Sequence, residues 1–187
     1  MSLLARVQRG ITPKPPRILV YGTEGVGKTT LGSQRPHSIF VLTEDGLDPI
    51  AADKFPLATI YDEVLATLGE LRTQPHDYET FVLDSLDWLE RLICDALCRQ
   101  YGVSSIEKVD GGYVHALSFW REIIDHLNAL RHERGMMIFL IAHSEVERFE
   151  DTESSPYDRY SPRLNKHAAD LVREWCCSPR GMPTPIC

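Results

Sequence analysis

One short segment constrains the fold of this chain more than any other. Residues 22–29 read GTEGVGKT and fit the phosphate-binding pattern G-x-x-x-x-G-K-[ST], between an apolar run at 18–21 and an expected helix start. Its glycines let backbone N–H groups face an anion, while Lys28 adds a positive charge and Thr29 offers a hydroxyl to Mg²⁺. An ordinary glycine-rich turn is the alternative. The expected phosphate-binding residues are Gly22, Thr23, Glu24, Gly25, Val26, Gly27, Lys28, Thr29 and Thr30.

Length and composition fit one domain. The chain has 187 residues, of which 43% are hydrophobic and 25% charged, so it can bury one core of ordinary size. We expect a basic, proline-rich arm at 1–16, a core at 17–175 and an irregular proline- and cysteine-rich tail at 176–187. No run of the sequence approaches the roughly 18 apolar residues of a membrane span. We therefore expect no membrane partner, a cytoplasmic location and five cysteines that stay reduced.

The charge distribution bears on partners. The net charge of −7 argues against a protein that coats nucleic acid through bulk electrostatics. However, the first acidic residue is Glu24, and four cationic residues precede it: Arg6, Arg9, Lys14 and Arg17. This arm could contact DNA, a neighbouring subunit or neither.

Hydrophobic patterning predicts strands that alternate with helices. Strands are expected at 18–21, 38–42, 80–83 and 136–142, and helices at 28–34, 62–72, 85–101 and 113–134. The third strand has no polar alternation, which is typical of a buried parallel strand. This order predicts an α/β fold with a mainly parallel sheet, helices on both faces, and ligands beyond the carboxyl ends of the strands.

Polar residues that follow the strands are candidates for the site. Asp84 ends the third strand and can hold Mg²⁺, unless it only caps the helix that begins near Ser85. Glu44 follows the second strand and is the best candidate to activate water, with Asp45 in reserve, although both fit an acidic turn. His143 ends the fourth strand, where it can face a γ-phosphate or play a structural role. We expect the first and third strands to end side by side and to grip a triphosphate together.

With these residues identified, the chain resembles phage-encoded RecA-like ATPases of the single-strand annealing and recombination type. The resemblance covers about residues 15–175 and lies in the phosphate loop combined with TEDG at 43–46, FVLDSL at 81–86, IAH at 141–143, DRY at 158–160 and RLNK at 163–166. It implies a RecA-like P-loop NTPase core, hydrolysis of ATP with Mg²⁺, and single-stranded DNA as partner. It also implies assembly into rings or filaments, with a phage annealing or single-strand-binding protein as a further candidate partner.

The resemblance implies roles for individual residues. Within one subunit, the roles fall to Lys28 on the phosphates, Glu44 as the water-activating carboxylate, Thr29 and Asp84 as magnesium ligands, and His143 as the sensor of nucleotide state. Because ATP lies between subunits in RecA-like assemblies, Arg163 and Lys166 are candidates for fingers that reach a neighbour's phosphates. The alternative for these two residues is a charged start to the last helix.

Two segments depart from this family. The segments expected to face DNA are 102–112 and 144–160, but the second carries six carboxylates against Arg148 and Arg159, the wrong sign for phosphate. After Trp175 the sequence becomes proline-rich, so we expect a chain that is truncated or out of frame there and an exposed sheet edge. Two other functions stay open: a non-hydrolysing nucleotide switch or assembly protein, and a small-molecule kinase. The kinase is disfavoured because 144–160 lacks the arginines of a lid.

Overall fold

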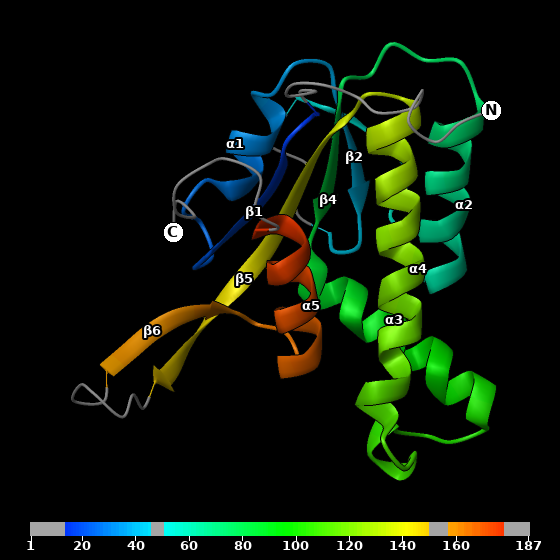
Figure 1. The fold of residues 1–187 in the computed structure, drawn as a ribbon, viewed down its shortest axis with the longest axis vertical. Helices are drawn as coiled ribbons and strands as arrows, with labels where there is room; N and C mark the ends of the chain where they lie inside the picture. Colours follow the sequence, from blue (N-terminus) through cyan, green and yellow to red (C-terminus); the bar gives the residue numbers. More distant parts are fainter. Residues whose placement is uncertain (1–13, 46–50, 150–156, 178–187) are drawn as a thin grey trace, which may run out of the picture.

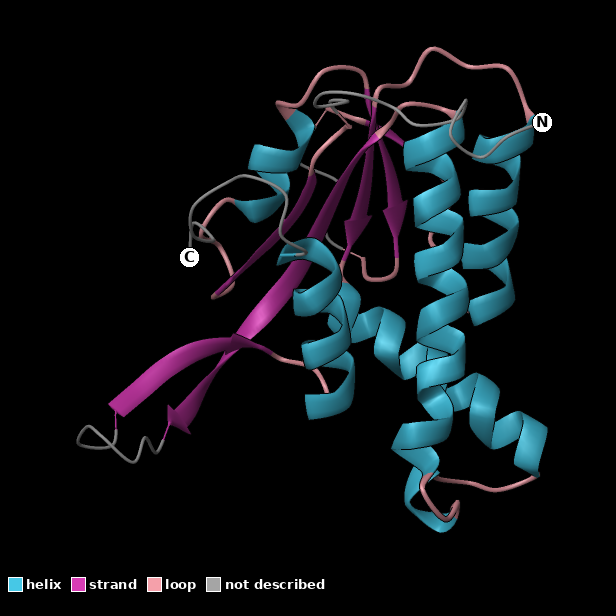
Figure 2. Cartoon of the chain, viewed as in Figure 1, coloured by secondary structure: helices cyan, strands magenta, loops and turns pink. Residues whose placement is uncertain are grey.

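Strands and helices alternate along the chain and build one mainly parallel sheet flanked by helices, which confirms the predicted α/β class (Figure 1, Figure 2). The structure is a computed structural model and describes residues 14–45, 51–149 and 157–177. Most of the arm at 1–16 and most of the tail at 176–187 therefore lie outside the described residues. The strands are β1 (Arg17–Gly22), β2 (Ser38–Leu42), β3 (Asp53–Lys54), β4 (Thr80–Asp84), β5 (Met137–Phe149) and β6 (Tyr157–Pro162).

The helices agree closely with the patterning of the sequence. They are α1 (Lys28–Ser33), α2 (Tyr61–Thr73), α3 (Leu86–Tyr101), the 3₁₀ turn η2 (Ile106–Lys108), α4 (Gly112–Glu133) and α5 (Lys166–Cys177). Each of the four helices expected before α5 forms, and in α2, α3 and α4 a stripe of apolar residues at helical spacing is buried in the core. No helix within the described ranges is long and apolar enough to cross a membrane.

The strand order corrects one expectation about the site. The sheet runs β1-β5-β4-β2-β3, so β5 separates the first and third predicted strands, which therefore do not end side by side. Gly22 at the end of β1 is level with His143 on β5, and Asp84 at the end of β4 is level with Ile141. Apolar patterning identifies buried strands but not their neighbours. His143 consequently lies between the phosphate loop and Asp84.

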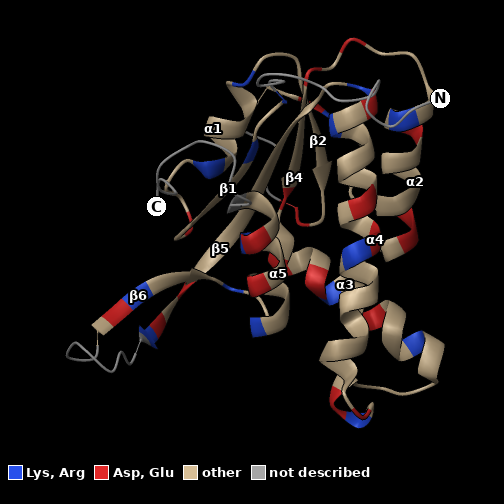
Figure 3. Ribbon diagram, in the orientation of Figure 1, with Lys and Arg blue, Asp and Glu red and all other residues tan. Residues whose placement is uncertain are grey.

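The segment 144–160, expected to be a loop, begins and ends as a β-ribbon instead. Strand β5 continues beyond the sheet and pairs antiparallel with β6, with Val146 opposite Tyr160. The ribbon projects away from the helices, and its acidic and basic residues lie close together (Figure 1, Figure 3). Glu147 and Arg159 form a cross-strand ion pair of 3.1 Å. Both faces of the ribbon are exposed to solvent, so charged residues can occupy strand positions here without being buried.

Helices cover both faces of the sheet, as predicted. The larger core packs α2, α3, α4 and α5 against one face, with Trp120 of α4 fully buried. The opposite face presents a smaller cluster that includes Phe40, Val82 and Phe139. Helix α1 packs there through Gly32, whose Cα is so close to the sheet that an added Cβ would be 3.2 Å from Val82. Among the described residues β1 pairs with β5 alone and forms an edge of the sheet.

Candidate active site

The phosphate loop connects β1 to α1 in a strongly curved conformation. Gly25 and Gly27 have φ angles of 76° and 90°, which side-chain-bearing residues rarely adopt. Lys28 is only 8% exposed, and its ammonium donates to the carbonyl oxygens of Gly22 (3.1 Å) and Thr23 (2.9 Å). The loop thus holds one buried positive charge at the carboxyl end of the sheet.

The side chains of Thr29 and Asp84 meet at this edge. The Thr29 hydroxyl donates a 2.7 Å hydrogen bond to Oδ2 of Asp84, which is 6% exposed. Burial raises the pKa of Asp84, while the Thr29 hydroxyl and the Lys28 charge oppose that increase. A hydroxyl and a carboxylate are hard oxygen donors of the kind that Mg²⁺ prefers, so these two side chains would hold a magnesium ion.

Backbone and hydroxyl contacts join the ends of β2 and β4. The Thr43 hydroxyl donates to the carbonyl oxygen of Ser85 (2.6 Å) and accepts from the N–H of Ser85 (2.9 Å). The Thr43 N–H also donates to the Asp84 carbonyl oxygen, at 2.8 Å. These contacts hold Thr43 against Ser85. Because Glu44 follows Thr43 and Asp84 precedes Ser85, Glu44 is held near Asp84.

Glu44 and His143 face each other across the site. Oε1 of Glu44 is 3.9 Å from Nε2 of His143, and the two side chains are 22% and 18% exposed. Burial raises the pKa of Glu44, the nearby His143 opposes this effect, and Asp84 adds to it. A partly desolvated carboxylate of raised pKa is a stronger base than a free one, as activation of water requires.

Asp87 is a site residue that the sequence reasoning missed. It lies in the first turn of α3 and is 5% exposed. The ring Nδ1 of His143 is 3.0 Å from Asp87 Oδ2, and Arg163 donates to the same oxygen at 2.8 Å. Burial alone would raise the pKa of Asp87, but the hydrogen bonds from Arg163 and His143 lower it to about 2. Its position in the first turn of the helix that follows Asp84 was the available signal, since that turn begins at the same strand end.

The predicted site residues are distributed unequally around the resulting cavity. The cavity has a volume of about 360 Å³ and is lined by Glu24, Gly25, Gly27, Lys28, Thr29, Thr30, Leu42, Glu44, Asp45, Asp84 and His143. Val26 is 64% exposed at the tip of the loop, outside the lining. Arg163 contacts Asp87 instead of the cavity, and Lys166 is exposed at the start of α5.

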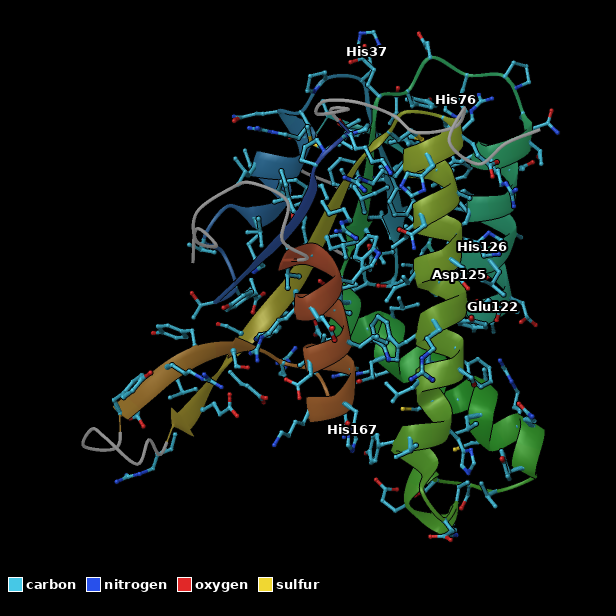
Figure 4. The ribbon with its side chains drawn as sticks, viewed as in Figure 1. His37, His76, Glu122, Asp125, His126 and His167 are labelled. Carbon is cyan, nitrogen blue, oxygen red and sulfur yellow. The ribbon has the colours of Figure 1, made fainter. Side chains whose placement is uncertain are left out.

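A second hollow lies away from these groups. It has a volume of about 520 Å³ beside α4, and the lining includes Glu122, Asp125 and His126 (Figure 4). His167 lies at the other end of the view from His37 and His76 (Figure 4), and His37 Nδ1 is 3.2 Å from the carbonyl oxygen of Asp77, next to His76. Within residues 14–45, 51–149 and 157–177, no group of three His, Cys, Asp or Glu side chains is arranged to hold a metal ion. The strand ends are therefore the better candidate site.

Comparison with known proteins identifies a family for this chain. The model of the AAA domain family matches residues 14–176. The chain is also similar to the SPbeta prophage-derived uncharacterized protein YorG of Bacillus subtilis (strain 168), with 22% identity over 151 residues. That match covers 79% of this chain and 45% of the relative, so the chain spans less than half of the relative's length. Because the family model covers most of the chain, the protein belongs to the AAA domain family.

Proposed function

We propose that the protein binds ATP with Mg²⁺, hydrolyses it, and acts on single-stranded DNA in phage recombination or annealing. The observation that supports hydrolysis is the convergence of Lys28, the Thr29–Asp84 pair and Glu44 on one cavity. The DNA part depends on the resemblance of the motifs to recombination ATPases, and the prophage origin of the relative is compatible with it.

Each group would have a distinct task at the triphosphate. Lys28 would exchange its two carbonyl partners for oxygens of the outer phosphates. Thr29 and Asp84 would hold Mg²⁺, which when bound neutralises charge on the phosphate oxygens. Glu44 would orient a water molecule and accept its proton, and His143 would contact the same region through Nε2.

The charges around the cavity favour a site completed by a second subunit. Among the described residues that line it, Lys28 is the single Lys or Arg, against four carboxylates at positions 24, 44, 45 and 84. The charge that develops on transferred phosphate usually needs an additional cation, and one supplied in trans is worth about 10³-fold or more in rate. We propose a homo-oligomer in which Lys166 or Arg163 of a neighbour supplies it. Lys166 is the better candidate, since Arg163 already binds Asp87.

An ATPase assay with and without single-stranded DNA tests this proposal. Wild-type protein should release phosphate, faster with DNA and with a specific activity that rises with protein concentration. Lys28→Ala and Asp84→Asn should abolish release. Arg72→Ala is the control, because Arg72 lies on α2 and binds Glu133 instead of the cavity.

The outcomes separate the alternatives. Turnover that is indifferent to DNA would contradict the recombination role while leaving the ATPase role intact. Tight ATP binding without phosphate release would instead identify a nucleotide-dependent switch or assembly protein. Failure of wild-type protein to bind ATP at all would overturn the whole proposal.

A further inference from the structure

Three nitrogen atoms from two segments converge on the buried carboxylate of Asp87. The backbone N–H of His143 donates to Oδ1 at 3.1 Å, and the His143 ring nitrogen Nδ1 lies 3.0 Å from Oδ2. The guanidinium of Arg163 donates to Oδ2 at 2.8 Å. The Asp87 side chain is 4% exposed, so water can supply few of the hydrogen bonds that its carboxylate requires. Such a position suits a group that only accepts hydrogen bonds.

We infer that Asp87 is a positioning residue that fixes the proton of His143 on Nδ1 and directs Nε2 toward Glu44 and the cavity. Arg163 is then the counter-ion of Asp87 within the same subunit. The geometry leaves little choice of tautomer, because an ionised carboxylate carries no proton to donate to Nδ1. The lowered pKa of Asp87, about 2, keeps the carboxylate ionised at neutral pH. The catalytic consequence rests on the proposed ATP hydrolysis, whereas the position of the ring proton does not.

The same carboxylate joins the cavity to the base of the β5–β6 ribbon. His143 is the last residue of β5 before the ribbon, and Arg163 directly follows β6. The Arg163 N–H donates to the His143 carbonyl oxygen at 2.8 Å. The two strands at the base of the ribbon are therefore joined to each other and, through Asp87, to α3. If Arg163 left Asp87 to contact a neighbouring subunit, the buried negative charge of Asp87 would lose its partner. Leaving a buried charge unpaired is strongly unfavourable.

Nitrogen-15 chemical shifts of the His143 ring, measured on nucleotide-free protein, test the inference directly. Wild-type protein should show a protonated Nδ1. In Asp87→Asn the amide offers one acceptor and one donor group to three donors, so the ring should change to the form with its proton on Nε2. Arg163→Gln removes only the counter-ion and should keep the proton on Nδ1. A bare Nδ1 in wild-type protein would overturn the inference without any variant.

Asp62→Asn is the matched control. Asp62 is also the second residue of a helix that follows an extended residue, but it is exposed on α2 and does not line the cavity. The thermal midpoint and the NMR spectrum of each variant check that it is folded. Asp62→Asn should leave the His143 ring shifts unchanged, and a change there would mean that the ring responds to general loss of helix charge.

A kinetic measurement then tests the catalytic consequence. Asp87→Asn should lower kcat on the order of tenfold to a hundredfold, because a general acid–base or electrostatic contact is worth roughly 10²–10⁴ when fully lost. The Kd for ATP should stay within about twofold, since Asp87 does not line the cavity. Equal kcat with a changed tautomer would refute the catalytic role of the ring. Absence of turnover in wild-type protein would refute the proposed function but not the tautomer assignment.

Discussion

The hydroxyl of Thr29 on α1 donates to Oδ2 of Asp84 at 2.7 Å, although the two residues are 55 positions apart and β1, the strand before α1, does not adjoin β4. Strand β5 lies between β1 and β4, so the contact passes across the carboxyl end of a third strand. The helix α1 makes this possible because it begins at Lys28 and carries Thr29 over the edge of the sheet. Two oxygen ligands suited to Mg²⁺ are thereby brought together by the fold alone.

Asp84→Asn should separate stability from nucleotide binding. Burial raises the folded-state pKa of Asp84 above 3.8, so the charged form destabilises the fold increasingly as pH rises through that pKa. At neutral pH and without nucleotide, the variant should therefore unfold at the same temperature as wild-type protein or higher. With Mg²⁺ and ATP at 100 times Kd, wild-type protein should gain about 2.7 kcal/mol, and the variant should gain almost nothing.

Asp45→Asn is the control for the Asp84 experiment, because Asp45 lines the same cavity but is exposed. Thermal unfolding with and without Mg²⁺ and ATP gives both quantities in one measurement. Equal stabilisation of wild-type protein and Asp84→Asn by ATP would exclude Asp84 as a magnesium ligand.

Sequence patterns predicted the elements of this fold well and their neighbours poorly. The segment Thr80–Asp84 was recognisable as a buried strand because apolar residues are continuous there, and Asp84 was recognisable as its polar end. Strand order depends on which helices cross which face of the sheet, and no local pattern reports it. The position of His143 between Gly22 and Asp84 was therefore not predictable from spacing.

The remaining differences have the same origin in long-range contacts. Val146 and Tyr160 are both exposed and pair across the ribbon, a contact that depends on two segments folding together. Asp87 binds His143 and Arg163, which lie 56 and 76 positions away. A sequence shows that this carboxylate follows Asp84 by three residues, but not which groups surround it.

Gly32→Val should weaken the fold and the nucleotide site together. An added Cβ at Gly32 would be 3.2 Å from Val82 and 3.3 Å from Phe40, closer than most such contacts. The extra methyl groups should push α1 off the sheet and lower the free energy of unfolding by roughly 1–3 kcal/mol. Since α1 carries Lys28 and Thr29, ATP affinity should also fall. Urea unfolding and ATP titration measure the two effects.

Gly69→Val is the matched control for Gly32→Val. Gly69 lies on α2, and an added Cβ there meets nothing within 4 Å. Its free energy of unfolding should stay within about 0.5 kcal/mol of the wild-type value, because Gly and Val differ little in helix propensity. Equal effects of both substitutions would contradict close packing of α1 against the sheet.

Glu44→Gln should distinguish catalysis from binding. The variant should bind ATP within about twofold of wild-type affinity but lose roughly 10²–10⁴-fold in kcat, as expected when a general base is removed. Because burial raises the pKa of Glu44 above 4.5, the wild-type rate should increase with pH through that raised pKa. The pH–rate profile of Asp45→Asn should keep this increase. If Asp45→Asn kept the wild-type pH–rate profile and Glu44→Gln kept the wild-type turnover, neither carboxylate would be the general base. Another residue would then have to accept the proton from water.

Glu90 should make the stability of the protein fall as pH rises. Both of its carboxylate oxygens accept from the N–H of Asn165, at 3.1 and 2.9 Å, just before α5. Burial raises the pKa of Glu90 from 4.5 to about 7. The negative charges of Asp87 and Glu145 raise this pKa further, whereas the hydrogen bond from the Asn165 N–H lowers it. Between these pH values the folded state keeps a proton that the unfolded chain has lost, so stability is full below about pH 4.5 and declines until about pH 7. The total is on the order of 3 kcal/mol.

Glu90→Gln should abolish this decline, because its amide oxygen still accepts from Asn165 and does not ionise. The difference in free energy of unfolding between variant and wild type, measured with urea from about pH 5 to about pH 8, should grow in favour of the variant. Glu70→Gln is the matched control, since Glu70 is exposed on α2 and its substitution should give a difference that is independent of pH. A constant difference for Glu90→Gln as well would show that Glu90 ionises near its ordinary pKa, and that water reaches the contact between α3 and α5.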